Sequence, residues 1–169
     1  MTIVSVLMAL LCLLFANVTV SDPLSIKVAS HGQTIISASA KGLTVQVKID
    51  THEQQIGKSS DPPPRVVDSN CTYSRYPCSI VDQLEIIVNG ATIFVPRSSF
   101  CDLADLNNAV ITFNNGGSVQ LRLEAGDGAE GTIVTIAFDS NQVRRRTVAS
   151  GESAKRLLQD TRYYAVTSD

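Results

Sequence analysis

Three cysteines beyond the apolar amino-terminal run are the side chains of this 169-residue chain that are most suited to covalent chemistry. Cys71 and Cys78 flank a short segment that contains a Tyr-Pro turn, and Cys101 is left over. In an oxidising compartment this spacing favours a Cys71–Cys78 disulfide, with a bridge from a loop cysteine to Cys101 as the competing pairing. Cys101 is then expected to be a small buried thiol or to bond to another molecule, and a catalytic thiol is disfavoured.

Two acidic clusters contain the types of side chain that bind metal ions. Asp127 and Glu130 lie in the glycine-rich loop 126–131, where carboxylates and backbone carbonyls are suitable ligands for calcium. The loop lacks the ordered Asp-x-Asp-x-Asp spacing, so it is a weak calcium candidate, and a solvated hairpin loop is the favoured interpretation. Asp102, Asp105 and Asn107 form a second cluster whose spacing equally suits the cap of a short helix. The sequence therefore predicts no metal site and no cofactor.

Arg144, Arg145 and Arg146 form the strongest local concentration of positive charge. These side chains suit an anion-binding patch for phosphate, sulfated glycan or lipid headgroups. The favoured interpretation is that they protect an edge strand, 142–148, from pairing with another chain. Should that strand be central instead, alternate arginines would be buried and would need acidic partners.

Known catalytic motifs are missing around the two histidines. His31 follows an expected strand and His52 lies past the end of another, and neither belongs to a His-x-x-x-His or Gly-x-Ser-x-Gly pattern. Catalysis is therefore not the expected role. A hydrolase of cell-wall or extracellular polysaccharide is kept as the alternative, because glycosidase chemistry needs only two carboxylates.

The first 21 residues read as a secretory signal peptide. No charged side chain appears before Asp22, and the run is apolar over the length of a signal-peptide core. Small residues at Ala16 and Ser21 offer cleavage points. The alternative is an uncleaved membrane anchor, since about 20 apolar residues are long enough to span a bilayer.

Alternation of apolar and polar residues dominates the rest of the chain, and the turns are rich in Gly, Asn and Asp. Asn89-Gly90 suits the type I′ turn of a tight hairpin. Three consecutive prolines mark 57–70 as an exposed loop. A few helical turns are expected over 99–106 and a short helix over 152–159. The expected strands are 24–28, 34–40 and 43–49 as a three-strand meander, then 84–88, 91–95, 109–113, 118–124, 132–138 and 142–148.

Together these patterns predict an all-β protein. Residues 22–169 are expected to form a single domain, an antiparallel β-sandwich or flattened barrel of eight or nine short strands with a short C-terminal helix. A formal net charge of −2 provides no field that would attract nucleic acid. The sequence therefore suggests a small secreted or periplasmic binding or inhibitory module with a protein or glycan partner. A membrane-tethered structural protein is a further alternative if the leader is retained.

Overall fold

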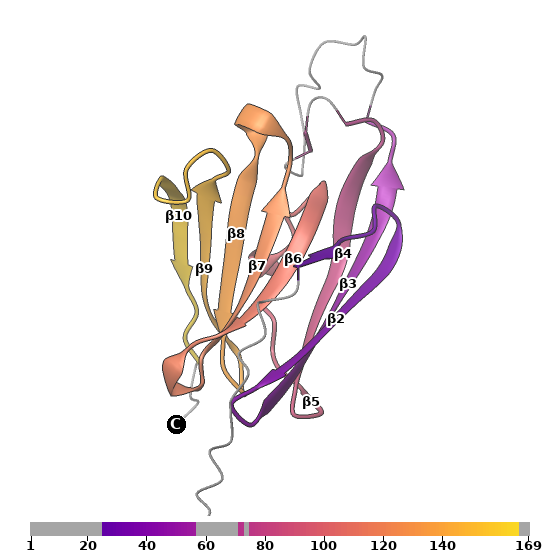
Figure 1. The fold of residues 1–169 in the computed structure, drawn as a ribbon. Coiled ribbons are helices and arrows are strands. Elements are labelled where there is room, and N and C mark those ends of the chain that lie inside the picture. Colours follow the sequence, from indigo (N-terminus) through magenta and orange to yellow (C-terminus); the bar gives the residue numbers. More distant parts are fainter. Residues whose placement is uncertain (1–24, 57–70, 73–74, 166–169) are drawn as a thin grey trace, which may run out of the picture.

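A computed structural model describes residues 25–56, 71–72 and 75–165. In this part of the chain ten strands form two antiparallel sheets (Figure 1). The six-stranded sheet has the order β1 (Ser25–Lys27), β6 (Leu106–Phe113), β7 (Val119–Ala125), β8 (Thr132–Phe138), β9 (Val143–Ser150) and β10 (Leu157–Arg162). The four-stranded sheet has the order β2 (Gly32–Ala40), β3 (Leu43–Gln54), β4 (Cys78–Val88) and β5 (Ala91–Thr92). Short 3-10 turns occur at η1 (Arg97–Ser99), η2 (Asn115–Gly117) and η3 (Gly128–Glu130).

The two sheets face each other in a sandwich-like arrangement, and their facing side chains form one core (Figure 1). Each strand alternates, so that one row of apolar side chains points inward and the other row faces solvent. Val47 and Ile86 from the smaller sheet and Leu121 and Ile136 from the larger sheet are fully buried in the shared cluster. Burial of such a side chain contributes about 1.5–3 kcal/mol each, so this common core is the main source of stability. The predicted all-β fold is confirmed.

The sheets are joined by hydrogen bonds at two corners. At one corner, residues 103–105 run beside the start of β4: the Val81 N–H donates to the Leu103 carbonyl, and the Asp105 N–H donates to the Ser79 carbonyl. At the other, Phe94 leaves the smaller sheet and its carbonyl accepts from the Val143 N–H at the start of β9. The first corner brings the cysteine loop and the acidic segment before β6 to the same end of the molecule.

The predicted Asn89-Gly90 hairpin is present. Asn89 has φ 50° and Gly90 has φ 82°, the left-handed conformation that a type I′ turn requires at both positions. The second strand, β5, is shorter than predicted, because the chain turns away after Thr92 and Phe94 bridges to the larger sheet.

Two sequence-based predictions about the chain's ends are wrong. The first strand, β1, does not belong to a meander with β2 and β3 but pairs with β6 in the other sheet. The predicted C-terminal helix over 152–159 is absent, and residues 157–162 form strand β10 instead. The hydrogen-bonding edge of β9 is available to this segment, and pairing with it outweighs the modest helix propensity of the sequence.

Residues 99–106 also differ from the prediction of helical turns, since a 3-10 turn covers only Arg97–Ser99 and β6 begins at Leu106. The predicted leader, 1–21, and the proline-rich loop, 57–70, lie outside the described residues. Among the residues that the structure does describe, no helix has the length and apolar character needed to cross a bilayer.

Candidate functional site

The predicted disulfide between Cys71 and Cys78 is present. It closes what we call the disulfide loop, residues 71–78, at the end of the sandwich where β4 begins. Closing a loop of this length contributes about 2–3 kcal/mol in the chain-entropy description. Cys101 carries a free thiol, and it is exposed, so the prediction of a small buried thiol is wrong, and a bond to another molecule stays a prediction. It follows a 3-10 turn at the surface and is not part of the core.

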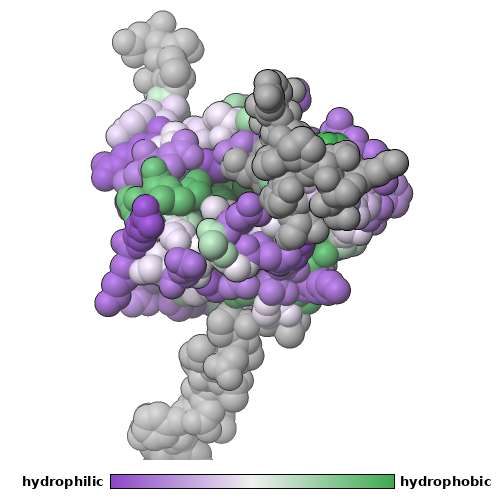
Figure 2. Space-filling view, turned by 90° about the horizontal axis from the view of Figure 1, so that it is seen from above, coloured by the Kyte–Doolittle hydropathy of each residue, from purple (hydrophilic) through white to green (hydrophobic). Residues whose placement is uncertain are grey.

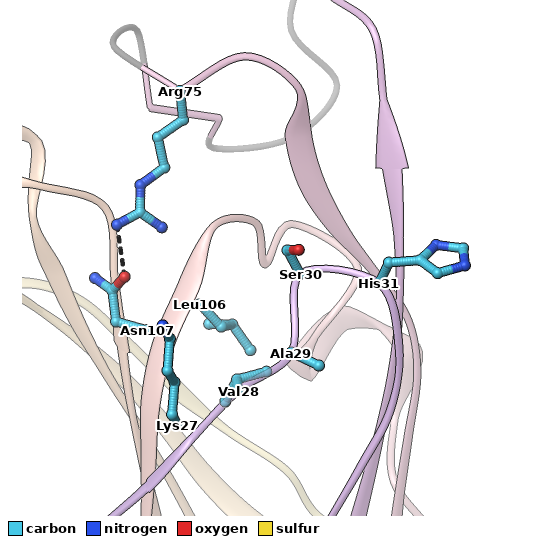
Figure 3. A pocket seen from close by; sticks show the side chains of 8 residues that line it. All are labelled: Lys27, Val28, Ala29, Ser30, His31, Arg75, Leu106 and Asn107. Atoms are coloured by element: carbon cyan, nitrogen blue, oxygen red, sulfur yellow. Dashed lines mark hydrogen bonds between the residues drawn. The ribbon is translucent and has the colours of Figure 1, made fainter.

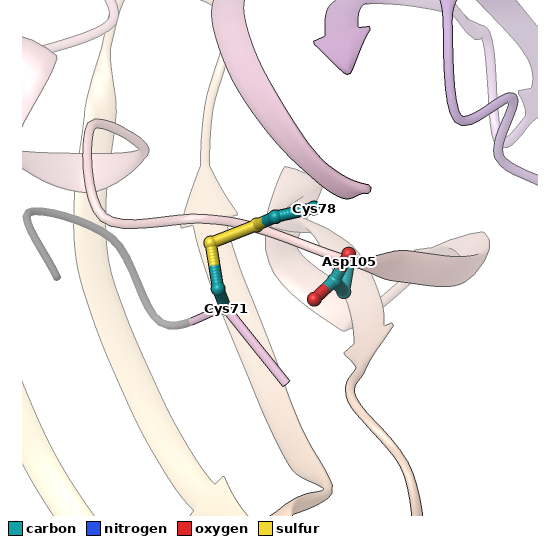
Figure 4. Close-up of side chains that lie close together, drawn as sticks. All are labelled: Cys71, Cys78 and Asp105. Carbon is teal, nitrogen blue, oxygen red and sulfur yellow. A yellow bond between two sulfur atoms is a disulfide. The ribbon is translucent and has the colours of Figure 1, made fainter. Parts of the chain in front are cut away.

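Asp105 fastens both ends of the disulfide loop. Its carboxylate accepts a hydrogen bond from the Thr72 N–H at 2.7 Å and another from the Ser79 N–H at 2.9 Å, and these residues follow Cys71 and Cys78 directly. The side chain lies beside the disulfide (Figure 4) and is 1% exposed. Its backbone has φ 49°, a left-handed conformation that Asp tolerates better than most residues. Asp105 therefore acts as a buried acceptor for the backbone of the disulfide loop, and not as the helix cap that its spacing equally suited.

Arg75 joins the middle of the disulfide loop to the larger sheet. Its Nε and Nη2 donate to the two carboxylate oxygens of Asp127 at 3.0 and 2.7 Å, and Nη2 also donates to Asn107 Oδ1 at 2.6 Å. Nη1 donates to the Asp105 carbonyl at 3.3 Å. The hydrogen bond with Asp127 raises the pKa of Arg75 and lowers that of Asp127. Sequence analysis missed Arg75, although its position between two bonded cysteines was a usable signal.

The predicted calcium candidates are arranged differently. Asp127 is the carboxylate partner of Arg75, and Glu130 ends the exposed turn η3. Within the described residues, the potential metal ligands that lie within 4.8 Å of one another are Cys71, Cys78 and Asp105. The disulfide uses both sulfur atoms, and the carboxylate already accepts two backbone hydrogen bonds, so these groups have a structural use and do not form a ligand set.

An open hollow of about 650 Å³ lies beside this braced end, where the β1–β2 connection passes the start of β6. Val28 and Leu106 provide apolar lining, and Arg75 extends from the disulfide loop toward Asn107 (Figure 3). Lys27 on β1 is the second cationic side chain of the lining. His31 borders the hollow as well, but its ring is directed away from Arg75 (Figure 3).

The other histidine lies on the outer face of the smaller sheet. His52 on β3 is hydrogen-bonded through Nδ1 to Asp82 on β4 at 2.8 Å, and both side chains are about half exposed. The pair bridges neighbouring strands, so it stabilises strand pairing and is separate from the hollow.

The arginine run lies on a central strand. β9 pairs with β8 on one side and with β10 on the other, so the prediction that these residues protect an edge is wrong. Each guanidinium has a different acidic partner: Arg144 binds Asp139 at 2.6 Å and Arg145 binds Asp160 at 2.7 Å. The partner of Arg146 is Asp102, at 2.8 Å. An anion-binding role for the run stays a prediction. An anionic ligand would have to compete with these three carboxylates for the guanidinium groups.

A bulge decides which arginine is buried. Simple alternation from Val143, which points into the core, would place Arg145 on the inner face. The register instead skips one residue, because Phe138 faces Val143 while Ala137 faces Arg145. Arg146 is therefore the inward residue, with 1% exposure, and Gln159 accepts a second hydrogen bond from it at 2.6 Å. Extra residues of this kind invert the sides of all later residues in a strand.

Acid is expected to loosen the ion pairs of the disulfide loop and of β10. Hydrogen bonds from Arg75 and Arg145 lower the pKa values of Asp127 and Asp160 below their ordinary 3.8. The folded state therefore binds fewer protons than the unfolded chain, so their contribution is complete above this range and is lost as the pH falls through the lowered values. The free energy of unfolding in urea should be measured at about pH 7, 5 and 3, on either side of the ordinary value of 3.8. It should decline only between the last two of these. An Asp127→Asn variant should decline less, and an equal decline would contradict the assignment.

Comparisons with protein-family models, with curated proteins and with solved structures found no match for this chain.

Proposed function

We propose that this protein is a secreted or periplasmic binding module with a β-sandwich fold, and that its binding site is the hollow beside the disulfide loop. The observation that supports the proposal most directly is that a disulfide and several hydrogen bonds hold that end of the molecule together. A disulfide, a buried carboxylate and the Arg75 side chain join segments as far as 52 residues apart in sequence. Surface loops held on a rigid scaffold are where proteins most often bind their partners.

The charges of the lining indicate the class of ligand. Arg75 is largely compensated by Asp127, but Lys27 is exposed and has no ion-pair partner among the described residues. The amide of Asn107 and the apolar side chains of Val28 and Leu106 complete a surface that has polar and apolar parts. The ligand we propose is therefore an acidic group, carried by a protein or a glycan, with an apolar portion beside it.

The disulfide supports an oxidising, extracytoplasmic environment for the folded protein. The apolar leader, 1–21, is consistent with secretion, and the proposal includes its removal. A hydrolase is less well supported, because a glycosidase needs two carboxylates facing a cleft. The described lining of the hollow provides cations and an amide instead.

Binding to the hollow is tested with a Lys27→Glu variant. The mature wild-type chain should bind acidic oligosaccharides or acidic peptides, screened by calorimetry, more tightly than neutral counterparts. Reversal of the charge at Lys27 should weaken that affinity about tenfold, because an attraction to the acidic group becomes a repulsion. Lys155→Glu is the matched control, because it makes the same charge change on an exposed residue of the β9–β10 turn.

Two results would count against this site. Equal losses in both lysine variants would mean that only net charge is sensed. A loss in Arg144→Gln together with unchanged binding in Lys27→Glu would move the site to the arginine run on β9. Arg75 is not a suitable test position, since its replacement also releases the disulfide loop.

A further inference from the structure

Within the described part of the chain, strand β10 is an edge of the larger sheet. It pairs with β9 on one side and forms the end of the strand order. The Tyr163 N–H donates to the Arg144 carbonyl, so the backbone groups of Tyr163 face β9. Backbone groups alternate along a strand, so the N–H and C=O of Asp160 and Arg162 face away from the sheet. These groups are the ones that another strand would pair with.

The apolar side chains at this edge are unusually exposed. Among the described residues, the exposed large hydrophobic side chains are Ile35, Phe94, Leu157, Leu158 and Tyr164, and the last three belong to β10 or follow it directly. Leu158 is 54% exposed and Tyr164 is 78% exposed. Figure 2 shows an apolar patch on the side of the molecule where Figure 1 places β10.

The charges of β10 complement themselves when the strand is paired antiparallel with its own copy. In a register centred on Thr161, Asp160 lies opposite Arg162 of the second copy, and the symmetry makes the same pair twice. Leu158 then lies opposite Tyr164 of that copy. Moving the register by one step of the same pleat places either Asp160 opposite Asp160 or Arg162 opposite Arg162, and like charges directly opposite are destabilising.

The individual side chains are suited to this pairing. Arg162 is exposed and has no ion-pair partner among the described residues, although its charge helps to lower the pKa of Asp160. Asp160 binds Arg145 within its own sheet and still has acceptor capacity, since a carboxylate offers about four lone-pair sites. Asp160 and Arg162 also have their backbone groups directed outward, as the hydrogen-bonded pairs of this register require.

We propose that this protein forms a symmetric dimer by antiparallel pairing of β10 with β10 of a second copy, in the register centred on Thr161. The larger sheets of the two chains would become one continuous sheet. The proposal does not depend on the hollow or on its ligand, because β10 and the disulfide loop are separate parts of the surface.

Crosslinking tests the register. A pair centred on Thr161 places the two Thr161 Cα atoms about 4.5 Å apart, within the range for a disulfide. In a Cys101→Ser background that removes the exposed thiol, Thr161→Cys should therefore form an intermolecular disulfide under mild oxidation. Gln159→Cys should not, since it faces Tyr163 of the other copy in this register. Crosslinking at position 159, or at neither position, would overturn the proposal.

Sedimentation of the mature chain tests the charges. We expect a concentration-dependent dimer whose dissociation constant rises about tenfold or more in Arg162→Asp, because two attractive pairs become repulsive. Arg156→Asp makes the same change of charge in the exposed turn before β10 and should leave the dimer unchanged. A chain that stays monomeric at every concentration tested, or a dimer equally affected by both variants, would refute the pairing.

Discussion

Replacement of Asp102 by alanine is expected to lower the free energy of unfolding by about 3 kcal/mol, although Asp102 itself is partly exposed. Its partner is the reason. The Arg146 side chain is 2% exposed while that of Asp102 is 39% exposed, so removal of the carboxylate leaves an uncompensated cation in the interior. Gln159 still accepts one hydrogen bond from Arg146, which places the expected cost at the lower end of the range for broken buried pairs.

Replacement of Arg146 by methionine should cost much less, about 1 kcal/mol, because it removes the buried charge itself. The carboxylate that remains, on Asp102, has access to water. The substitution also removes Arg146 Nε, a buried donor for which the described residues provide no hydrogen-bond acceptor. The double variant should therefore be more stable than Asp102→Ala alone, although it carries one more substitution.

Far-UV circular dichroism during urea unfolding suits these measurements, since the chain has no tryptophan. Arg145→Met is the matched control on the neighbouring residue, whose ion pair with Asp160 is exposed. Exposed pairs of that kind contribute little to stability, so Arg145→Met should unfold close to the wild-type urea concentration. If Asp102→Ala and Arg146→Met prove equally destabilising, burial of the charge is not the dominant effect.

Most of the strands were predictable from sequence because they follow a local rule, and β10 is the exception. Alternation marks the strands, and Asn89-Gly90 marks a turn that needs left-handed backbone at two positions. The spacing of Cys71 and Cys78 was sufficient to predict their disulfide, because a short loop with a turn brings the two sulfur atoms together. These features depend on residues close to one another in the chain.

The errors concern choices that local sequence does not determine. Alternation in β1 is the same whether the strand pairs with β2 or with β6, so its sheet was not predictable from its own residues. Residues 157–162 are a strand because β9 offers an edge, which is a property of the folded sheet. The bulge at Arg144 likewise depends on β8, and it is what buries Arg146.

The candidate site was only partly predictable for the same reason. Asp105 and Asp127 belong to the two acidic clusters that the sequence offered only as weak metal candidates, and their partners are backbone groups and an arginine far away in sequence. Thr72 and Ser79 are neighbours of Asp105 only through the corner between the sheets. Sequence spacing therefore located the polar residues of this end but not the interactions that hold it together.

Replacement of Asp105 by alanine is expected to be the most destabilising of the substitutions considered, at about 4 kcal/mol. The Thr72 and Ser79 N–H groups would lose their acceptor, and each unsatisfied buried donor costs about 1–3 kcal/mol. Alanine is also strained at φ 49°, which adds about 1 kcal/mol.

Two further variants at Asp105 separate these contributions. Asp105→Gly removes the acceptor but tolerates the left-handed backbone, so it should recover only the strain, about 1 kcal/mol. Asp105→Asn tolerates that backbone as well and retains one acceptor oxygen, but its NH₂ group meets the second N–H, so an intermediate cost of about 2 kcal/mol is expected. The loss of stability should also be visible locally, at the disulfide. The two N–H groups belong to the residues that follow Cys71 and Cys78, so dithiothreitol should reduce the disulfide faster in Asp105→Ala than in Asp105→Asn. Equal stability and equal reduction rates across the three variants would show that the carboxylate does not hold the disulfide loop. If the free energy of unfolding instead falls in the order Asp105→Asn, Asp105→Gly, Asp105→Ala, the hydrogen bonds account for the larger share of the effect.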